Sequence, residues 1–190
     1  MPKIDDRLPF LPVNIAVLTV SDSRTAENDT SGNTLAERIA EAGHKVAARI
    51  ILPDDKDQLV RQLNHWIDDP EIDVIISTGG TGVTGRDVTP EAFHAVYDKE
   101  IVGFGELFRQ LSYAKIGTST IQSRATAGVA RGTYLFALPG STSACREGWD
   151  DIIVWQLDSR HKPCNLVELM PRLQEHLKHE DEEETGAGEN

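Results

Sequence analysis

The hydrophobic pattern along the chain alternates between short β-branched runs and longer segments with helical spacing. The runs at 13–20, 45–52 and 73–78 are rich in Val, Ile and Leu, and each predicts a strand. The first run is apolar at nearly every position, which is typical of a strand covered on both faces.

Helical spacing fills the intervals between these runs. One predicted helix ends near Gly43 and has apolar residues on one face, namely Leu35, Ile39 and Ala40. The next predicted helix carries an apolar stripe made of Leu59, Leu63, Trp66 and Ile67. Thr89-Pro90-Glu91 predicts a further helix start, with a Thr N-cap, Pro at the first helical position and an acid in the first turn.

The second half of the chain is less regular. A helix is expected over 104–114, and a strand over 133–141 that ends in Pro-Gly. The segment 121–132 is compatible with a short helix or with a hairpin, and 97–105 is not strand-like. A helix is also expected over 141–160, because several residues share a helical register there: Trp149, Ile152, Ile153, Gln156 and Leu157.

Strands that alternate with helices predict an α/β fold, a three-layer sandwich with a mostly parallel central sheet and helices on both faces. We expect residues 1–179 to form a single domain, because no repeat or linker interrupts the pattern. Ligands in such sheets bind beyond the carboxyl ends of the strands. Four loops rich in Gly, Ser, Thr or Asp follow predicted strands, and together they predict one site: TVSDSR, LPDD, TGGTGVTGRD and LPGSTSA.

Charge argues against a nucleic-acid partner. The formal net charge is −12, and the segment 180–190 holds six of the 31 acidic residues and no Lys or Arg. Without that segment the charge is −6, and the body has no Lys/Arg-rich run of the kind that phosphate backbones require. The acidic segment is expected to be a disordered, solubilising tail.

Other features of the composition point to the cytoplasm. No apolar run reaches the roughly 20 residues of a membrane span, and the first 13 residues lack the apolar core of a secretory signal. The two cysteines, Cys145 and Cys164, are far apart, so a disulfide framework is not expected. We therefore predict a cytoplasmic protein with no membrane partner.

The glycine-rich stretch DVIISTGGTGVTGRDVTPEA (73–92) carries the clearest chemistry. Residues 80–85 match the dinucleotide fingerprint G-x-G-x-x-G, but they follow the third predicted strand and end before the helix starts. A P-loop is also excluded, because Arg86-Asp87 replaces Lys-Ser/Thr. Glycines still let backbone N–H groups approach an anion closely, and Thr81, Thr84 and Arg86 add donors. The loop therefore favours phosphate.

Asp87 at the end of this loop has two interpretations. Its carboxylate would repel a phosphate unless a cation lay between them, and Mg²⁺ prefers carboxylate and phosphate oxygens. Alternatively, the carboxylate caps the loop or the helix by accepting backbone N–H bonds. The residue pattern leaves both interpretations open.

Longer motifs over residues 13–165 resemble the MoaB/Mog family of molybdenum cofactor biosynthesis proteins, and bacterial MoaB in particular. The glycine motif GGTG-x-x-x-x-D-V-T-P and the later L-P-G-S/N motif are shared with the related G domains of gephyrin and its plant counterpart. The motifs that carry the resemblance are STGGTGVTGRDVTPEA, LTVSDSR…DTSG, GFGELFR, STIQSRATAGVARGTYLFALPGSTSACREGW and DSRHKPCN.

The resemblance implies a compact α/β protein that assembles as a homotrimer, or as a homohexamer of two trimers. It implies that the protein binds molybdopterin, a pterin with a dithiolene and a terminal phosphate. In active members Mg²⁺ and ATP adenylylate that phosphate and pyrophosphate is released. A separate protein or domain then inserts molybdate, so a molybdate-insertion protein is an expected downstream partner.

The resemblance also implies site residues. Asp54 in LPDD and Asp87 take the catalytic, Mg²⁺-binding role, although the neighbouring Asp55 allows a shift by one position and a helix N-cap is the alternative for Asp54. Glu106 is either a site residue or a solvated helix position, and Ser123-Arg124 reach either a phosphate or a neighbouring subunit. The implied substrate-binding residues are Ser21, Ser23, Ser31, Gly32, Gly79, Gly80, Thr81, Gly82, Arg86, Glu106, Ser123, Pro139, Gly140 and Ser141.

Two interpretations of function follow. Some family members lack the first acid and are inactive, so the presence of both acids here favours an adenylyltransferase. A catalytically silent molybdopterin-binding or assembly protein is the alternative. The segment 101–113 also carries more apolar surface than one helix face can bury, which predicts that Phe104, Phe108 and Leu111 lie near a subunit contact unless they complete the monomer core.

Overall fold

The computed structural model describes residues 3–175, and the acidic tail lies outside the described residues. A six-stranded sheet forms its centre, in the order β3-β2-β4-β7-β6-β5. The first four strands in this order are parallel, and β6 and β5 add an antiparallel edge. The strands are β2 (Asn14–Val20), β3 (Lys45–Leu52), β4 (Val74–Thr78), β5 (Lys99–Glu100), β6 (Thr126–Ala130) and β7 (Thr133–Leu138).

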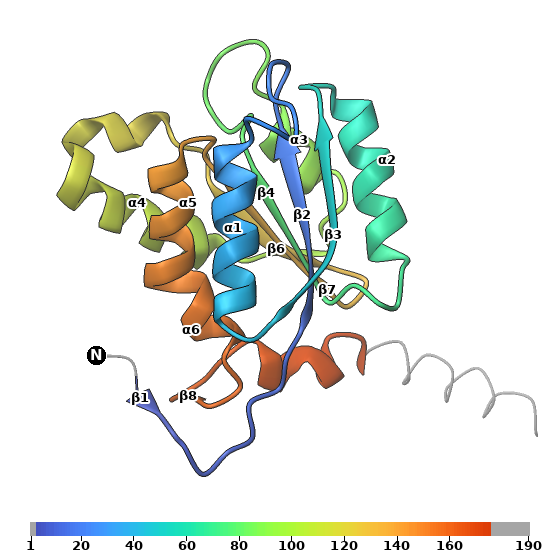
Figure 1. The fold of residues 1–190 in the computed structure, drawn as a ribbon, viewed down its shortest axis with the longest axis vertical. Helices are drawn as coiled ribbons and strands as arrows, with labels where there is room; N and C mark the ends of the chain where they lie inside the picture. Colours follow the sequence, from blue (N-terminus) through green and yellow to red (C-terminus); the bar gives the residue numbers. More distant parts are fainter. Residues whose placement is uncertain (1–2, 176–190) are drawn as a thin grey trace, which may run out of the picture.

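Helices cover both faces of this sheet, which confirms the three-layer α/β fold (Figure 1). One face is covered by α1 (Thr30–Glu41), α4 (Val102–Ile116) and α5 (Thr142–Gly148). The other face is covered by α2 (Lys56–Ile67) and α3 (Thr89–His94). In β2, Ile15 and Val17 join the first core while Ala16 and Leu18 join the second, so burial on both sides explains why this strand is apolar at nearly every position.

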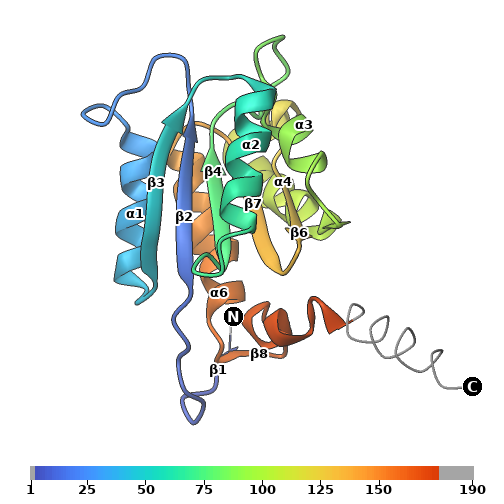
Figure 2. The same ribbon diagram turned by 90° about the vertical axis from the view of Figure 1, so that its right-hand side faces the viewer.

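A short two-stranded sheet, β1 (Lys3–Ile4) with β8 (His161–Lys162), lies at the end of the molecule opposite the glycine loop (Figure 2). The helix expected over 141–160 is present as α5, the π-turn η2 (Trp149–Ile153) and α6 (Val154–Leu157) in succession. Two 3₁₀ helices complete the described chain, η1 (Gly117–Gln122) and η3 (Val167–Arg172). None of the helices in residues 3–175 is long and apolar enough to cross a membrane.

Several sequence-based expectations need correction. Ala40 is exposed rather than part of the buried face of α1. Thr89 is the first residue of α3 rather than its N-cap, because its hydroxyl donates to the Gly79 carbonyl at 2.8 Å. The segment 97–105 contains the short edge strand β5. Of the two structures left open for 121–132, the hairpin is the one found, since this segment supplies β6 and the turn that leads into β7, after the last two residues of η1.

The two phenylalanines of α4 belong to the monomer core. Phe104 is 5% exposed and Phe108 is 1% exposed, and Phe104 packs edge-on against Phe136 of β7. Leu111 is partly buried against the same core. The two phenylalanines therefore complete the monomer core, which is the alternative to the expected position at or near a subunit contact. The exposed apolar residues of α4 and η1 are instead Val102, Leu107, Tyr113, Ile116 and Ile121.

Candidate active site

The glycine loop after β4 is fixed to the neighbouring strand end by hydrogen bonds. The Gly79 N–H donates to the Leu138 carbonyl at 3.0 Å, and the Thr78 hydroxyl donates to the Pro139 carbonyl at 3.0 Å. From the other side, the Thr89 N–H donates to the Gly80 carbonyl at 3.0 Å. The loop therefore begins rigidly at the carboxyl edge of the sheet.

Two glycines in this loop allow a close approach that a side chain would block. Gly79 has φ +102°, and a Cβ there would lie 2.1 Å from the Val20 carbonyl oxygen. Gly80 has φ +64°, and a Cβ there would lie 2.7 Å from Oδ1 of Asp54. Glycine is the residue that tolerates both the positive φ and the contact. The backbone of the loop thus lies directly against the Asp54 carboxylate.

Two cavities flank the loop, and Gly80, Asp87 and Gly140 line both of them. The first, which we call the aspartate cavity, has about 220 Å³. It is lined by Thr19, Val20, Ser21, Arg24, Ser31, Asp54, Thr78, Gly79, Gly80, Arg86, Asp87 and Gly140. The second, which we call the serine cavity, has about 400 Å³. It is lined by Gly80, Thr81, Gly82, Asp87, Phe108, Ser112, Ile116, Ser119, Gln122, Ser123, Pro139, Gly140, Ser141 and Ala144.

The structure brings together most of the residues expected at the site. Three do not line either cavity. Ser23 is exposed beyond the rim, Glu106 is exposed on α4, and Gly32 lies inside the first turn of α1, where its N–H donates to Asp29 at 2.9 Å. Those expected to bind substrate that do line a cavity are Ser21, Ser31, Gly79, Gly80, Thr81, Gly82, Arg86, Ser123, Pro139, Gly140 and Ser141.

Asp54 and Asp55 have different positions although they are adjacent. Asp55 is the N-cap of α2, and its Oδ1 accepts the Gln58 N–H at 3.0 Å. Asp54 lines the aspartate cavity. Burial, together with the nearby carboxylates of Asp22 and Asp87, raises the pKa of Asp54. The helix cap therefore belongs to Asp55, and Asp54 is the acid that faces the loop.

Asp87 both caps the loop and lines the two cavities. Its Oδ2 accepts the Thr84 N–H at 2.8 Å and the Thr84 hydroxyl at 2.6 Å. Burial opposes ionisation of this carboxyl, but the hydrogen bonds from Thr84 and Gly82 outweigh burial and lower its pKa. Asp87 is therefore an ionised acid held in one orientation.

Asp22 is a third acid at this edge that sequence reasoning did not single out. It accepts two hydrogen bonds at 2.8 Å from Nη2 of Arg86, and its Oδ1 also accepts the Asp54 N–H at 3.2 Å. The Arg86 side chain lowers the pKa of Asp22. Asp22 and Arg24 lie in the strand-end loop TVSDSR, so that loop was a sufficient signal for both. Arg86 is paired with Asp22 in the structure and would have to turn to reach a phosphate.

The first turn of α1 and the loop after β7 meet across the aspartate cavity. The Ser31 hydroxyl donates to the Gly140 carbonyl at 2.7 Å. Behind it, the buried carboxylate of Asp29 accepts from Thr19 at 2.8 Å and pairs with Arg49 at 3.1 Å. Ser31 therefore ties the first turn of α1 to the loop after β7.

Side chains from α4 and η1 form the far wall of the serine cavity. Sequence reasoning gave no signal for Ser112, Ser119 and Gln122, because only the tertiary placement of α4 and η1 brings them to this cavity. Ser112 is anchored by donating its hydroxyl to Oε2 of Glu147 at 2.7 Å. The cavity combines hydroxyl and amide groups with the apolar side of Phe108.

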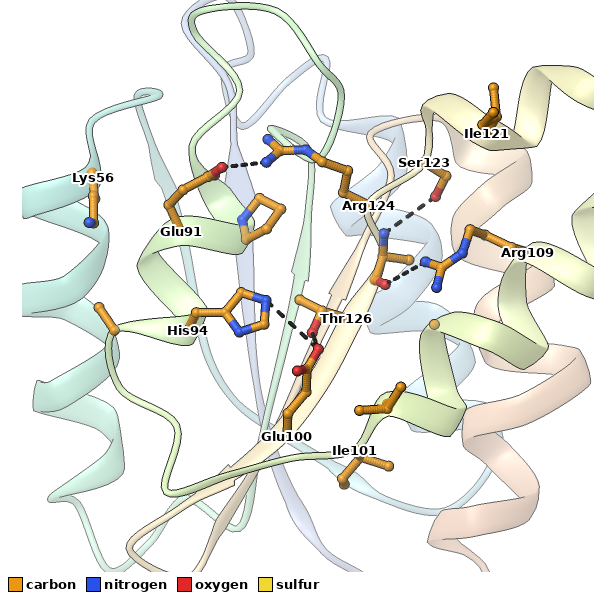
Figure 3. Close-up of a pocket in the computed structure, with 15 residues that line it drawn as sticks. Lys56, Glu91, His94, Glu100, Ile101, Arg109, Ile121, Ser123, Arg124 and Thr126 are labelled. Carbon is orange, nitrogen blue, oxygen red and sulfur yellow. Dashed lines mark hydrogen bonds and ion pairs between the residues drawn. The ribbon is translucent and has the colours of Figure 1, made fainter.

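A larger groove of about 860 Å³ lies outside the glycine loop, between α3 and α4 (Figure 3). Two pairs of its ionisable side chains are already in contact, His94 with Glu100 and Arg124 with Glu91. It shares Ser123 with the serine cavity but contains neither Asp54 nor Asp87. Despite its size, this groove lacks the carboxylates and glycines that give the strand-end cavities their chemistry.

The donor set at the carboxyl edge fits Mg²⁺ with a phosphate ligand. Asp54 and Asp87 both line the aspartate cavity. Burial and then the nearby charges of Asp22 and Asp87 raise the pKa of Asp54, and a divalent cation would offset both effects. In residues 3–175 no group of three or more His, Cys, Asp or Glu side chains forms a complete metal site. Mg²⁺ commonly binds through one or two carboxylates and takes its other ligands from phosphates and water.

Comparison with known proteins decides the family. A family model described as "Probable molybdopterin binding domain" matches residues 16–159. Molybdenum cofactor biosynthesis protein B of Escherichia coli K12 is 50% identical over 157 residues, which cover 83% of this chain and 92% of that protein. The chain belongs to the MoaB/Mog family of molybdenum cofactor biosynthesis proteins. The corresponding protein of Bacillus subtilis is 44% identical over 146 residues, or 76% of this chain and 86% of that protein.

Solved MoaB/Mog structures share the fold. A crystal structure of molybdenum cofactor biosynthesis protein B has a TM-score of 0.76 and 44% identity, and the match covers 77% of this chain and 92% of that chain. The tungsten cofactor synthesizing protein MoaB of Pyrococcus furiosus has a TM-score of 0.67 and 39% identity, over 74% of this chain and 90% of that chain. Both the family and the fold indicated by the sequence motifs are confirmed, and the chain functions in molybdenum cofactor biosynthesis.

Proposed function

We propose that this MoaB/Mog protein binds molybdopterin and transfers AMP from Mg²⁺-ATP to its terminal phosphate, with release of pyrophosphate. One observation carries the proposal. Asp54 and Asp87 line the same cavity as the glycine loop, while the neighbouring Asp55 is used as a helix cap. An acid that neither caps a helix nor forms an ion pair, placed beside a phosphate-binding loop, is a suitable Mg²⁺ ligand.

The reaction needs positioning more than acid–base chemistry. A phosphate monoester has a second pKa near 6, so the attacking phosphate is mostly dianionic at neutral pH and requires no general base. Its oxygen attacks the α-phosphorus of ATP, and the bond from that phosphorus to the pyrophosphate oxygen breaks. The barrier comes largely from bringing two polyanions together in line.

The chain's own residues are suited to that task. Asp54 and Asp87 would hold Mg²⁺, which would supply charge neutralisation. Backbone N–H groups of the glycine loop and the hydroxyls of the converging loops hold phosphate oxygens in fixed positions. Arg86 exchanges its partner Asp22 for a phosphate when the nucleotide binds, since a guanidinium forms paired hydrogen bonds with a carboxylate and with a phosphate alike.

The two cavities suit the two substrates differently. The aspartate cavity holds both acids together with Arg24 and Arg86, which fits the metal-bound polyphosphate of a nucleotide. The serine cavity presents hydroxyl and amide groups beside an aromatic ring, which fits a flat polar heterocycle such as a pterin. Because Gly80, Asp87 and Gly140 line both cavities, the two substrates would meet at the glycine loop.

The direct test is a single-turnover incubation of the protein with molybdopterin and Mg²⁺-ATP, analysed by mass spectrometry. The proposal requires adenylylated molybdopterin and pyrophosphate in equal amounts, and a loss of both products in Asp87→Asn with pterin affinity nearly unchanged. Binding of molybdopterin without any AMP transfer would replace the proposal with the alternative, a catalytically silent binding or assembly protein that passes molybdopterin to a downstream molybdate-insertion protein.

A further inference from the structure

Arg124 lies between η1 and β6, about forty positions along the chain from the glycine loop, yet most of its contacts are to that loop. Its Nε donates to the Gly82 carbonyl at 2.6 Å, and its Nη2 donates to the Asp87 carbonyl at 2.9 Å. Its backbone N–H donates to the Thr81 carbonyl at 3.1 Å. One residue thus binds three carbonyl groups, at both ends of the loop.

The third nitrogen of the guanidinium contacts an acid that lies outside the two strand-end cavities. Nη1 of Arg124 pairs with the carboxylate of Glu91 on α3 (Figure 3). Arg124 lines the groove between α3 and α4, and it does not line the aspartate cavity or the serine cavity. The guanidinium therefore approaches the loop from behind and is not placed to hold a substrate phosphate.

These contacts fix the direction of the peptide groups in the loop. In a trans peptide the C=O and the following N–H point in opposite directions. Because the Arg124 N–H holds the Thr81 carbonyl, the following Gly82 N–H points away from Arg124 and towards Asp87. Gly82 N–H, which follows the bound Thr81 carbonyl, is one of the donors that lower the pKa of Asp87.

Asp87 is consequently held on two sides. Thr84 donates two hydrogen bonds to its carboxylate from within the loop, and Arg124 holds its main-chain carbonyl from outside. Between these two anchors the side chain has little freedom to rotate. A ligand for a cation with strict octahedral geometry requires such fixed placement.

We infer that Arg124 is a positioning residue, which fixes the Asp87 carboxylate by holding the Gly82 and Asp87 carbonyls of the glycine loop. The effect on catalysis rests on the proposed adenylyl transfer, whereas the effect on loop order does not. Lysine keeps the positive charge at this position but has a single ammonium, which cannot bind the Gly82 and Asp87 carbonyls and Glu91 together in the fork geometry of arginine.

Arg124→Lys is the test variant, and Arg131→Lys is its matched control. Arg131 follows the opposite end of β6 and also joins separate segments, through Nε to Asp68 at 3.1 Å and Nη2 to Asn64 at 2.7 Å. Glu91→Gln is a second control, because it removes the ion pair and leaves the carbonyl contacts of Arg124 in place. The readouts are kcat and KM for AMP transfer, and amide hydrogen exchange of the segment 79–92.

We expect Arg124→Lys to lower kcat roughly 10²-fold, as misplacement of a reacting group by about 1 Å does, with a much smaller change in the KM for molybdopterin. Exchange over 79–92 should become faster in this variant and remain as in the wild type in both controls. Wild-type exchange and kcat in Arg124→Lys, or equal losses in Arg131→Lys, would overturn the inference.

Two further results remain informative. If the wild-type protein transfers no AMP, the proposed function fails, while the exchange comparison still decides whether Arg124 orders the loop. If Arg124→Lys does not fold, Arg124→Gln takes its place, since its amide can bind one carbonyl. Rapid loop exchange in a folded Arg124→Gln supports the inference, and unchanged exchange opposes it.

Discussion

Replacing Asp54 or Asp55 with alanine should produce opposite effects, because the two neighbouring acids have different environments. Asp55 accepts the Gln58 N–H at 3.0 Å as the N-cap of α2. Loss of an N-cap costs about 1 kcal/mol, within a range of roughly 0.5–2 kcal/mol. For a chain of 190 residues that corresponds to a fall in melting temperature of about 2–4 °C.

Asp54 has no such structural role. Its side chain accepts no hydrogen bond within residues 3–175, and burial beside two other acids raises its pKa. Removing the carboxylate relieves repulsion, so Asp54→Ala should melt at the wild-type temperature or slightly above it. Turnover should instead fall by about 10²-fold or more, as when one preorganised electrostatic group is removed from an active site.

The assay pairs differential scanning calorimetry with single-turnover AMP transfer on both variants. Asp55→Ala should lose stability and keep at least most of its turnover, while Asp54→Ala should lose turnover and keep its stability. The reverse pattern would show that Asp55 is the acid of the site. Equal losses of both properties in both variants would refute the separation of roles.

Three further predictions concern the rest of the molecule. Burial lowers the pKa of His44 below 6.5, although the charge of a nearby aspartate opposes this shift, and the His44 Nδ1 accepts the Val13 N–H. The melting temperature should therefore fall as the pH drops below 6.5, because protonation of His44 is easier in the unfolded chain. In His44→Asn, which keeps a hydrogen-bond acceptor, this pH dependence should be weaker, and an unchanged pH dependence would exclude His44 as its source. Burial raises the pKa of the Cys145 thiol to about 11, whereas Cys164 is exposed. A thiol reagent at pH 8 should therefore label Cys164 alone until the protein is denatured. Rapid labelling of Cys145 in the native protein would contradict its burial. We also propose that the exposed apolar side chains of α4 and η1 form the contact between subunits of a homotrimer or hexamer. Ile121→Glu should then give a smaller, folded species by light scattering, and an unchanged mass would exclude this surface as the subunit contact.

Periodicity predicted the elements best where local pattern and tertiary environment agreed. The run that became β2 is mostly apolar because both of its faces are buried, so its pattern alone predicted a strand covered on both sides. Thr89 shows the opposite case. Its local pattern is that of an N-cap, but its hydroxyl donates a hydrogen bond to the Gly79 carbonyl instead of capping the helix. The helix therefore begins at Thr89 itself, one residue earlier than it would with Thr89 as the N-cap.

The sequence predicted which loops form the site, because these loops follow the carboxyl ends of the strands, but not how their side chains are arranged. Loops that follow parallel strands must meet at one edge, which is why Asp54, Asp87 and Gly140 were expected together. Contacts that depend on side-chain direction were not predictable, and the pairing of Arg86 with Asp22 is one example. The capping role of Asp55 rather than Asp54 also required the start of α2 to be known to a single residue.

The most direct test of the central claim is a crystal structure with a nonhydrolysable ATP analogue and Mn²⁺ in place of Mg²⁺. The anomalous signal of Mn²⁺ locates the metal independently of the nucleotide. Our account predicts one strong peak between the carboxylates of Asp54 and Asp87, with the phosphates against the glycine loop. A peak elsewhere, for example beside Glu91 and Glu100 in the groove between α3 and α4, would contradict it.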